Sequence, residues 1–289
     1  MFKRTFRHLK AAPLGAVALA IALLSCTGTA SAADTPQAAI ALPSNIQTAK
    51  KIKIALFAGF PPMAWKKPDT NELVGLDVEL ANYLSKRLGV AVEWQEVSYE
   101  SAINSLVTGR VDMAFSLLDS PEAADRLDYL PYLTSGMQPY TLASHAPVAT
   151  ALDICGLKVG ANRRNGFDAA MRKWSDANCL PAGKPAVQVQ ATDGTATARL
   201  DLKQGRVDVA VQSSESVPTT MALEKGTYVT IGKPLNRLQI VAAFPKQSGA
   251  LRAAVSQALK DAVADGSYAT ALAKYDLGDN SAATAILAH

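Results

Sequence analysis

Residue types on which catalysis and metal binding depend are scarce in this sequence of 289 residues. It has three histidines, of which His8 lies in the N-terminal segment and His289 is the last residue, so His145 alone remains for chemistry. The zinc-protease helix motif, the Walker A loop, the nucleophile elbow and the dinucleotide glycine fingerprint are all missing. We therefore expect no catalytic residue, no bound metal and no cofactor.

A surplus of charge is missing too, once the N-terminus is set apart. The whole chain has 29 Lys+Arg and 25 Asp+Glu, but four basic residues and no acidic ones fall within the first 32 residues, which leaves 25 of each. A balanced surface does not attract nucleic acid or an anionic membrane. No later segment is long and apolar enough to span a bilayer.

The N-terminus has the three parts of a secretory signal peptide. Four basic residues precede an uncharged apolar run at residues 11–26, and residues 30–32 form an A-x-A site. We expect residues 1–32 to be a signal peptide cleaved after Ala32, and the mature protein to be periplasmic. The alternative is a lipoprotein, because residues 23–26 resemble a lipobox ending at Cys26.

Outside the signal only Cys155 and Cys179 remain. An even number of cysteines in an exported protein favours a disulfide bond. This bond would close a loop of about 25 residues and stabilise the fold by roughly 3 kcal/mol in the chain-entropy model. The alternative is a pair of buried free thiols.

Strand and helix patterns alternate along the chain from Ile52 and do so twice. Apolar strands at 52–57, 90–94 and 111–115 are separated by helical patterns, and strands at 157–160, 187–189 and 207–211 repeat that order. The sequence Gly-Arg-Val-Asp at 109–112 returns at 205–208. We therefore predict an α/β fold of two equivalent lobes, each a βαβ-type sheet with flanking helices. Strand-like connections at 139–144 and 238–244 would form a two-strand hinge.

These patterns give a domain organisation. The predicted parts are a flexible leader at 33–50, the first part of lobe 1 at 51–143, lobe 2 at 144–237, and a return strand with C-terminal helices of lobe 1 at 238–289.

The order of the elements and their local motifs resembles the family-3 extracellular solute-binding proteins, the polar amino-acid-type receptors of ABC importers. The resemblance spans residues 51–277, and its motifs lie at 60–65, 73–81, 109–112, 120–122, 127–132, 157–160, 205–208 and 265–268. It implies the type II periplasmic-binding-protein fold. It also implies a monomeric receptor that captures a small polar ligand by lobe closure and delivers it to a membrane permease.

The resemblance also implies where the ligand binds, and the carboxyl ends of open α/β sheets are where ligands sit in general. Each candidate has a structural alternative, such as core packing for the aromatic residues and helix capping for Asp119. The candidates are Phe60, Trp65, Tyr99, Ser116, Asp119, Ser120, Asn162, Arg163, Arg164, Asn165, Ser213 and Glu215.

Two departures from the family pattern bear on the ligand. Ala123 stands where the family has an arginine that grips the ligand's carboxylate, and Ser213 stands where it has an aspartate that binds the amine. Whether Arg126, Arg164 or Glu215 takes over these roles is open. We predict that standard amino acids bind weakly or not at all.

An enzyme on the same fold is the alternative from another class. Periplasmic cyclohexadienyl (arogenate) dehydratases resemble this fold, and Glu215 or Asp119 would be the proton donor in such chemistry. A turnover assay with prephenate and arogenate separates the two readings.

Overall fold

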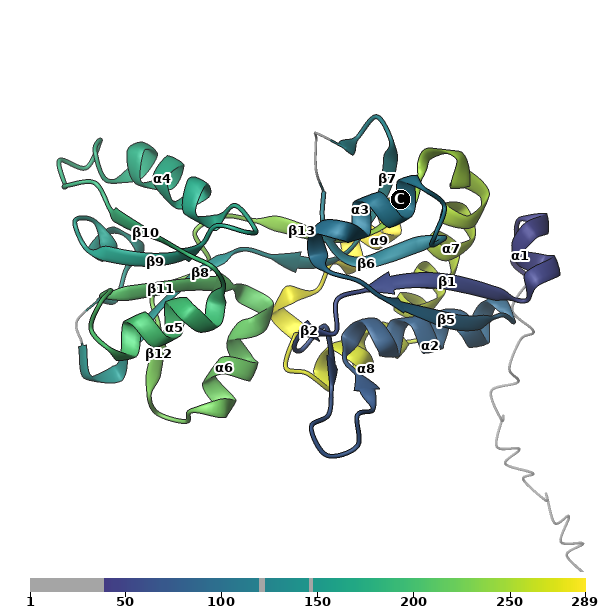
Figure 1. Cartoon of the computed structure of the whole chain (residues 1–289), viewed down its shortest axis with the longest axis horizontal. Coiled ribbons are helices and arrows are strands. Elements are labelled where there is room, and N and C mark those ends of the chain that lie inside the picture. Colours follow the sequence, from purple (N-terminus) through teal and green to yellow (C-terminus); the bar gives the residue numbers. More distant parts are fainter. Residues whose placement is uncertain (1–38, 120–122, 146–147) are drawn as a thin grey trace, which may run out of the picture. The chain divides into compact units, whose positions relative to one another are not determined.

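The computed structural model describes residues 39–119, 123–145 and 148–289 (Figure 1). Residues Ala39–His289 form one compact unit. No helix within the described ranges is long and apolar enough to cross a membrane. The predicted signal peptide at 1–32 and the candidate Ser120 lie outside the described residues.

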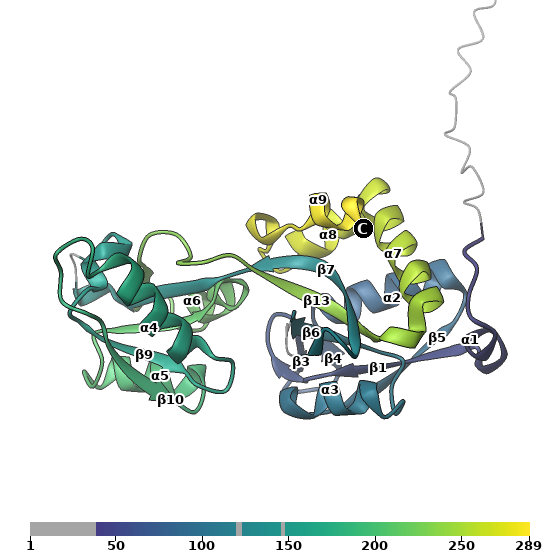
Figure 2. The same cartoon turned by 90° about the horizontal axis from the view of Figure 1, so that it is seen from above.

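The first lobe is built on a five-stranded sheet with the spatial order β5-β1-β6-β13-β7 (Figures 1 and 2). β1 is parallel to β5 and β6, whereas β13 is antiparallel to β6 and β7. The strands are β1 (Lys51–Leu56), β5 (Ala91–Glu96), β6 (Met113–Leu118), β7 (Leu127–Ser135) and β13 (Leu238–Pro245). A small sheet of β2 (Gly59–Phe60), β3 (Ala64–Lys66) and β4 (Leu73–Val74) follows β1.

Helices cover both faces of this sheet, as expected for an α/β layer. The larger core lies under α2 (Leu76–Leu88), α7 (Gly249–Ala264), α8 (Ser267–Ala273) and α9 (Ala283–Ala288). The smaller core on the opposite face lies under α3 (Tyr99–Val107).

The second lobe has its own five-stranded sheet, with the order β10-β9-β11-β8-β12. Its strands are β8 (Met137–Leu142), β9 (Lys158–Asn162), β10 (Gln188–Thr192), β11 (Val209–Ser213) and β12 (Tyr228–Thr230). One core includes residues of α4 (Phe167–Asn178), and a separate core includes residues of α5 (Thr195–Lys203). Helix α6 (Val217–Leu223) follows β11. The predicted α/β fold of two sheet-based lobes is confirmed.

The Gly-Arg-Val-Asp repeat has the same structural role in both lobes. Asp112 accepts a hydrogen bond from the Lys53 backbone N–H at 2.7 Å, and its own N–H donates to the Lys53 carbonyl at 2.9 Å. Asp208 makes the same pair of contacts with Lys158, both at 2.9 Å. Each aspartate therefore joins the start of the central strand to the start of its parallel neighbour.

Two long strands connect the lobes. β7 leads directly into β8 of the second sheet, and β13 returns beside β7 (Figure 2). β8 therefore belongs to the second lobe, and the chain leaves the first sheet near Gly136, earlier than our boundary at 143. A Cβ atom at Gly136 would lie 2.3 Å from the Asn236 carbonyl oxygen, so only glycine permits this close approach of the two connections.

The described part of the predicted flexible leader is a packed element. Residues Ser44–Ala49 form helix α1, and Ile46 is buried in the larger core of the first lobe. Ile40 and Leu42 pack against the same core. Our expectation for 33–50 is therefore corrected for residues 40–49, because three apolar side chains anchor them.

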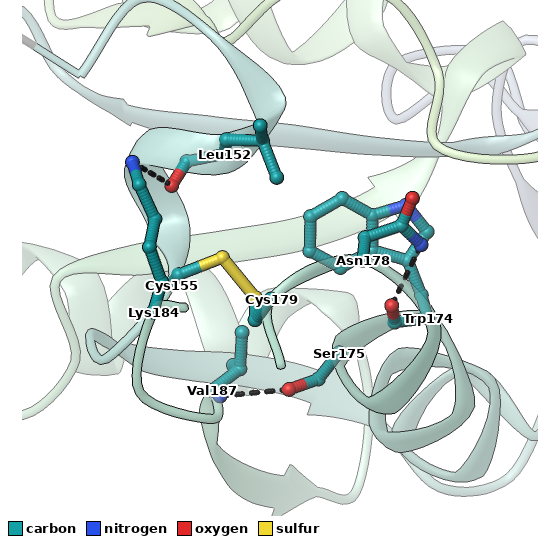
Figure 3. The surroundings of a disulfide bond; sticks show 8 residues. All are labelled: Leu152, Cys155, Trp174, Ser175, Asn178, Cys179, Lys184 and Val187. Atoms are coloured by element: carbon teal, nitrogen blue, oxygen red, sulfur yellow. Dashed lines mark hydrogen bonds between the residues drawn. A yellow bond between two sulfur atoms is a disulfide. The ribbon is translucent and has the colours of Figure 1, made fainter. Parts of the chain in front are cut away.

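The predicted disulfide bond is confirmed. Cys155 and Cys179 are joined with a Cα–Cα distance of 5.7 Å, which links the segment before β9 to the end of α4 (Figure 3). Hydrogen bonds support the connected segments, from Lys184 Nζ to the Leu152 carbonyl at 2.9 Å and from the Val187 N–H to Ser175 Oγ at 2.9 Å.

Candidate functional site

Ser116 lies near the carboxyl end of β6, at a break in the strand's regular pattern. Its φ of 57° is in the left-handed region. Leu117 pairs with Val241, and Ala114 pairs with Ala243, so β6 holds one more residue than β13 between these pairs. This is a β-bulge, a device that redirects a strand near functional sites.

Asp77 and Tyr132 hold this bulge through hydrogen bonds to Ser116. Ser116 Oγ donates to Asp77 Oδ2 at 2.6 Å, Tyr132 Oη donates to Asp77 Oδ1 at 2.6 Å, and the Ser116 N–H donates to Tyr132 Oη at 3.0 Å. Asp77 and Tyr132 are fully buried. Burial raises the pKa of Asp77 to about 7, although the hydrogen bonds from Ser116 and Tyr132 oppose the rise.

This network uses the polar groups of Ser116 within the lobe. Its hydroxyl hydrogen is committed to Asp77, so a ligand would find only an acceptor there. Our sequence reasoning missed Asp77, because an acid in the first turn of a helix is usually explained by the helix dipole.

Of the other candidates in lobe 1, Tyr99 and Asp119 lie near the end of β6, whereas Phe60 and Trp65 pack against other side chains. Tyr99 begins α3, and its hydroxyl hydrogen-bonds the backbone of Leu118 at the end of β6. Phe60 is half-buried against the larger core. Trp65 instead packs edge-on against Tyr275, with ring centroids 5.8 Å apart. Asp119 is exposed directly after β6.

The position of the missing carboxylate-binding arginine is closed to solvent. Ala123 is 2% exposed and packs in the smaller core. Arg126 is largely exposed and lies 3.5 Å from Asp125.

The turn after β9 uses most of its polar groups locally. Asn162 Oδ1 accepts a hydrogen bond from the Arg164 N–H at 3.0 Å, and Asn165 Oδ1 accepts one from the Phe167 N–H at 3.2 Å. Arg163 forms an ion pair with Asp193, and the Arg163 N–H donates to the Thr192 carbonyl. Arg164 is exposed. This turn therefore offers an anion fewer free N–H groups than we expected.

Glu215 of the second lobe is an acid whose side chain is almost completely buried. It follows β11 in a short 3-10 helix, Ser214–Ser216, and is 1% exposed. Ser135 Oγ donates to its Oε2 atom at 2.5 Å, while its Oε1 atom has no hydrogen-bond partner among the described residues. Burial raises the pKa of Glu215 to about 7, and hydrogen bonds from Ser135, from its own backbone N–H and from Ser213 oppose the rise. Ser213, which stands where the family has an aspartate, thus forms a hydrogen bond with Glu215.

Among the described residues, neither a group of metal-binding side chains nor the hollow beside the disulfide points to another ligand site. Across the described ranges, no group of three His, Cys, Asp or Glu residues could hold a metal ion. A shallow hollow of about 540 Å³ lies beside α4 and is lined by Trp174, Lys233 and Leu235 among others, but by none of the candidate ligand residues.

Comparison with known proteins agrees with the fold and the motifs. Residues 52–279 match the family described as bacterial extracellular solute-binding proteins, family 3. The L-cystine-binding protein TcyJ of Escherichia coli is 26% identical over 265 residues, which cover 89% of this chain and 94% of that protein. The L-cystine-binding protein TcyA of Bacillus subtilis is 27% identical over 208 residues, covering 72% and 74%.

Solved structures share the fold. Tv2483 bound to L-arginine has a TM-score of 0.69 at 19% identity and covers 83% of this chain and 96% of its own. The ancestral amino-acid-binding protein AncCDT-1, described as a precursor of cyclohexadienyl dehydratase, has a TM-score of 0.65 at 23% identity, covering 80% and 97%. Because the family model matches residues 52–279, most of its length, this chain belongs to the bacterial extracellular solute-binding proteins of family 3.

Proposed function

We propose that the protein is a periplasmic receptor that captures a small, positively charged polar ligand by lobe closure and delivers it to the permease of an ABC importer. The observation that supports the charge of the ligand best is Glu215. A buried carboxylate with an unpaired oxygen is costly, and a cationic ligand group would relieve that cost.

The ligand's carboxylate, by contrast, lacks the arginine that holds it in the family pattern. Ala123 supplies no guanidinium, and the exposed Arg163 is already paired with Asp193. An α-amino acid would bring a carboxylate into a closing site without the two parallel bonds that arginine gives. We therefore propose that the preferred ligand carries a cation but no carboxylate that must be clamped.

Aromatic and polar residues at the other strand ends complete the proposed site. In this proposal Phe60 and Tyr99 stack on the ligand, Asp119 reinforces the preference for a cation, and the turn at 162–165 supplies polar contacts. Trp65 and Ser116 support these residues more than they touch the ligand, since Trp65 packs on Tyr275 and Ser116 bonds Asp77.

A matched thermal-shift screen tests this proposal. The compounds are three amino acids and the amines obtained by removing their carboxylates: L-arginine with agmatine, L-lysine with cadaverine, and L-ornithine with putrescine. A ligand stabilises the folded state by RT ln(1+[L]/Kd), so affinity is read from the shift in Tm. We expect at least one amine to shift Tm more than its parent amino acid; the reverse order in all three pairs would contradict the proposal.

Catalysis is the second candidate, because Glu215 retains a proton near neutral pH and acids of this kind serve as general acids. The likeness to AncCDT-1 concerns an amino-acid-binding ancestor and supports the fold alone. We propose that the protein is not an enzyme. Incubation with prephenate and with arogenate should leave both compounds unchanged, and conversion that is lost in the Glu215→Gln variant would show the enzyme reading to be correct.

Export and assembly complete the proposal. We propose a monomer whose mature chain begins at Ala33. Intact mass of protein from the periplasm checks the N-terminus, and a diacylglycerol adduct on Cys26 would show a lipoprotein. Light scattering checks the monomer.

A further inference from the structure

Strand β7, which leads into the hinge, contacts the proposed ligand-binding acid Glu215 directly. Ser135 is the last residue of β7, immediately before the chain passes into the second lobe, and it is 4% exposed. Its hydroxyl donates to Glu215 Oε2 at 2.5 Å, whereas Glu215 Oε1 has no hydrogen-bond partner among the described residues. One oxygen of the carboxylate is thus held by the hinge, and the other is buried without such a partner.

The residues on either side of Ser135 hold the same loop. The Gly136 carbonyl accepts a hydrogen bond from the Ser214 N–H at 2.9 Å. Asn280 Nδ2 donates to the Thr134 carbonyl at 2.8 Å and to Ser214 Oγ at 3.1 Å. Three consecutive hinge residues therefore fix the loop that carries Glu215, one of them through Asn280.

Among the described residues, uncharged groups donate the hydrogen bonds that the carboxylate of Glu215 accepts. Its hydrogen bonds come from the Ser135 hydroxyl, from its own backbone N–H and from the Ser213 side chain. On the neighbouring elements, Arg237 before β13 is exposed and donates to Thr134 Oγ1 at 3.5 Å, and Asp279 beside Asn280 is exposed. The hydrogen bond from Ser135 is therefore a principal stabiliser of the charged form, and it opposes the burial that raises the pKa of Glu215.

We propose that Ser135 is a positioning residue for ligand recognition: it fixes Glu215 through Oε2, leaves Oε1 for the ligand's cationic group, and so joins the hinge to the bound ligand through one carboxylate. This inference rests on the proposed function. Ser135 and the ligand's cationic group share the carboxylate of Glu215. A change in hinge geometry therefore alters the affinity for a cation, and binding of a cation alters the hinge in return.

A titration that needs no ligand tests the contact. We would follow the Glu215 side-chain carboxyl carbon by ¹³C NMR in the mature protein, assigning its signal by loss in Glu215→Gln. Ser135→Ala should raise the pKa of Glu215 by roughly one to two units, because a hydrogen bond to the charged form is lost. Ser135→Thr retains a hydroxyl and should stay close to the wild type. Ser105→Ala, which removes an equally buried hydroxyl within α3, should leave the pKa unchanged.

Binding of agmatine then separates positioning from a general structural role. Ser135→Ala should weaken agmatine binding roughly tenfold at pH 7, and the loss should shrink toward pH 9, where the carboxylate of the variant ionises. A loss of equal size at all pH values, or an unchanged pKa of Glu215, would overturn the inference. If that pKa moves as expected and wild-type protein binds no amine, the proposed ligand class is wrong while the contact between Ser135 and Glu215 stands.

Discussion

Replacing Tyr132 by phenylalanine should strongly destabilise the first lobe. The hydroxyl that is lost donates to Asp77 at 2.6 Å and accepts the Ser116 N–H at 3.0 Å, all within the buried core. Loss of a hydrogen bond to a charged group costs about 1.5–3 kcal/mol, and a buried N–H left without a partner costs about 1–3 kcal/mol. We therefore expect the free energy of unfolding to fall by about 3–5 kcal/mol at pH 8, where Asp77 is ionised.

The second lobe offers a matched control. Tyr140 is also fully buried, but its hydroxyl has no hydrogen-bond partner in the part of the chain that the structure describes. Tyr140→Phe removes the same atom without breaking a bond, so stability should stay the same or rise by up to about 1 kcal/mol. Both variants keep the packing of the ring.

Equilibrium unfolding in urea, followed by circular dichroism, measures both changes. The midpoint of Tyr132→Phe should fall well below that of the wild type, and the midpoint of Tyr140→Phe should not. Similar losses in both variants would refute the reasoning, because the effect would then follow from burial of the hydroxyl and not from its hydrogen bonds.

Three further predictions follow from other parts of the molecule. Reducing the bond between Cys155 and Cys179, which are 24 residues apart, should cost about 3 kcal/mol of unfolding free energy; alkylation of two free thiols in protein taken directly from the periplasm would contradict the bond. Phe60→Ala should weaken ligand binding by roughly 1–3 kcal/mol in calorimetry, because the proposed stacking of the ring on the ligand is lost. Because Asp77 and Glu215 have pKa values raised to about 7, their protonated forms favour folding, and this stability, on the order of a few kcal/mol, should be lost as pH rises from about 4 through 7. Combining Asp77→Asn with Glu215→Gln should remove most of that pH dependence of urea unfolding, and an unchanged dependence would contradict the pKa values.

Features that depend on local pattern could be predicted from the sequence. The alternation of strand and helix and the repeat that contains Asp112 and Asp208 are set by residues close together in the chain, and the structure places both aspartates in the same role. The pairing of Cys155 with Cys179 followed from there being no other candidate partner outside the signal.

Features that depend on distant contacts could not be predicted. The segment from β7 into β8 is one extended stretch, and its strand pattern does not reveal that it changes sheets near Gly136. In the sequence, Asp77 is an ordinary acid in the first turn of a helix. Its hydrogen bond from Tyr132, 55 residues away, is visible only in the structure. The bulge at Ser116 is likewise visible only from its pairing with β13.

Calorimetry of the mature protein with agmatine and with L-arginine tests the central claim most directly, because the two ligands share a guanidinium and differ in the carboxylate. Glu215 predicts a cation site, and Ala123 predicts that no carboxylate clamp accompanies it. We predict that agmatine binds at least tenfold more tightly than L-arginine, and that Glu215→Gln removes most of this binding. Sub-micromolar binding of L-arginine, with agmatine binding more weakly, would contradict the claim.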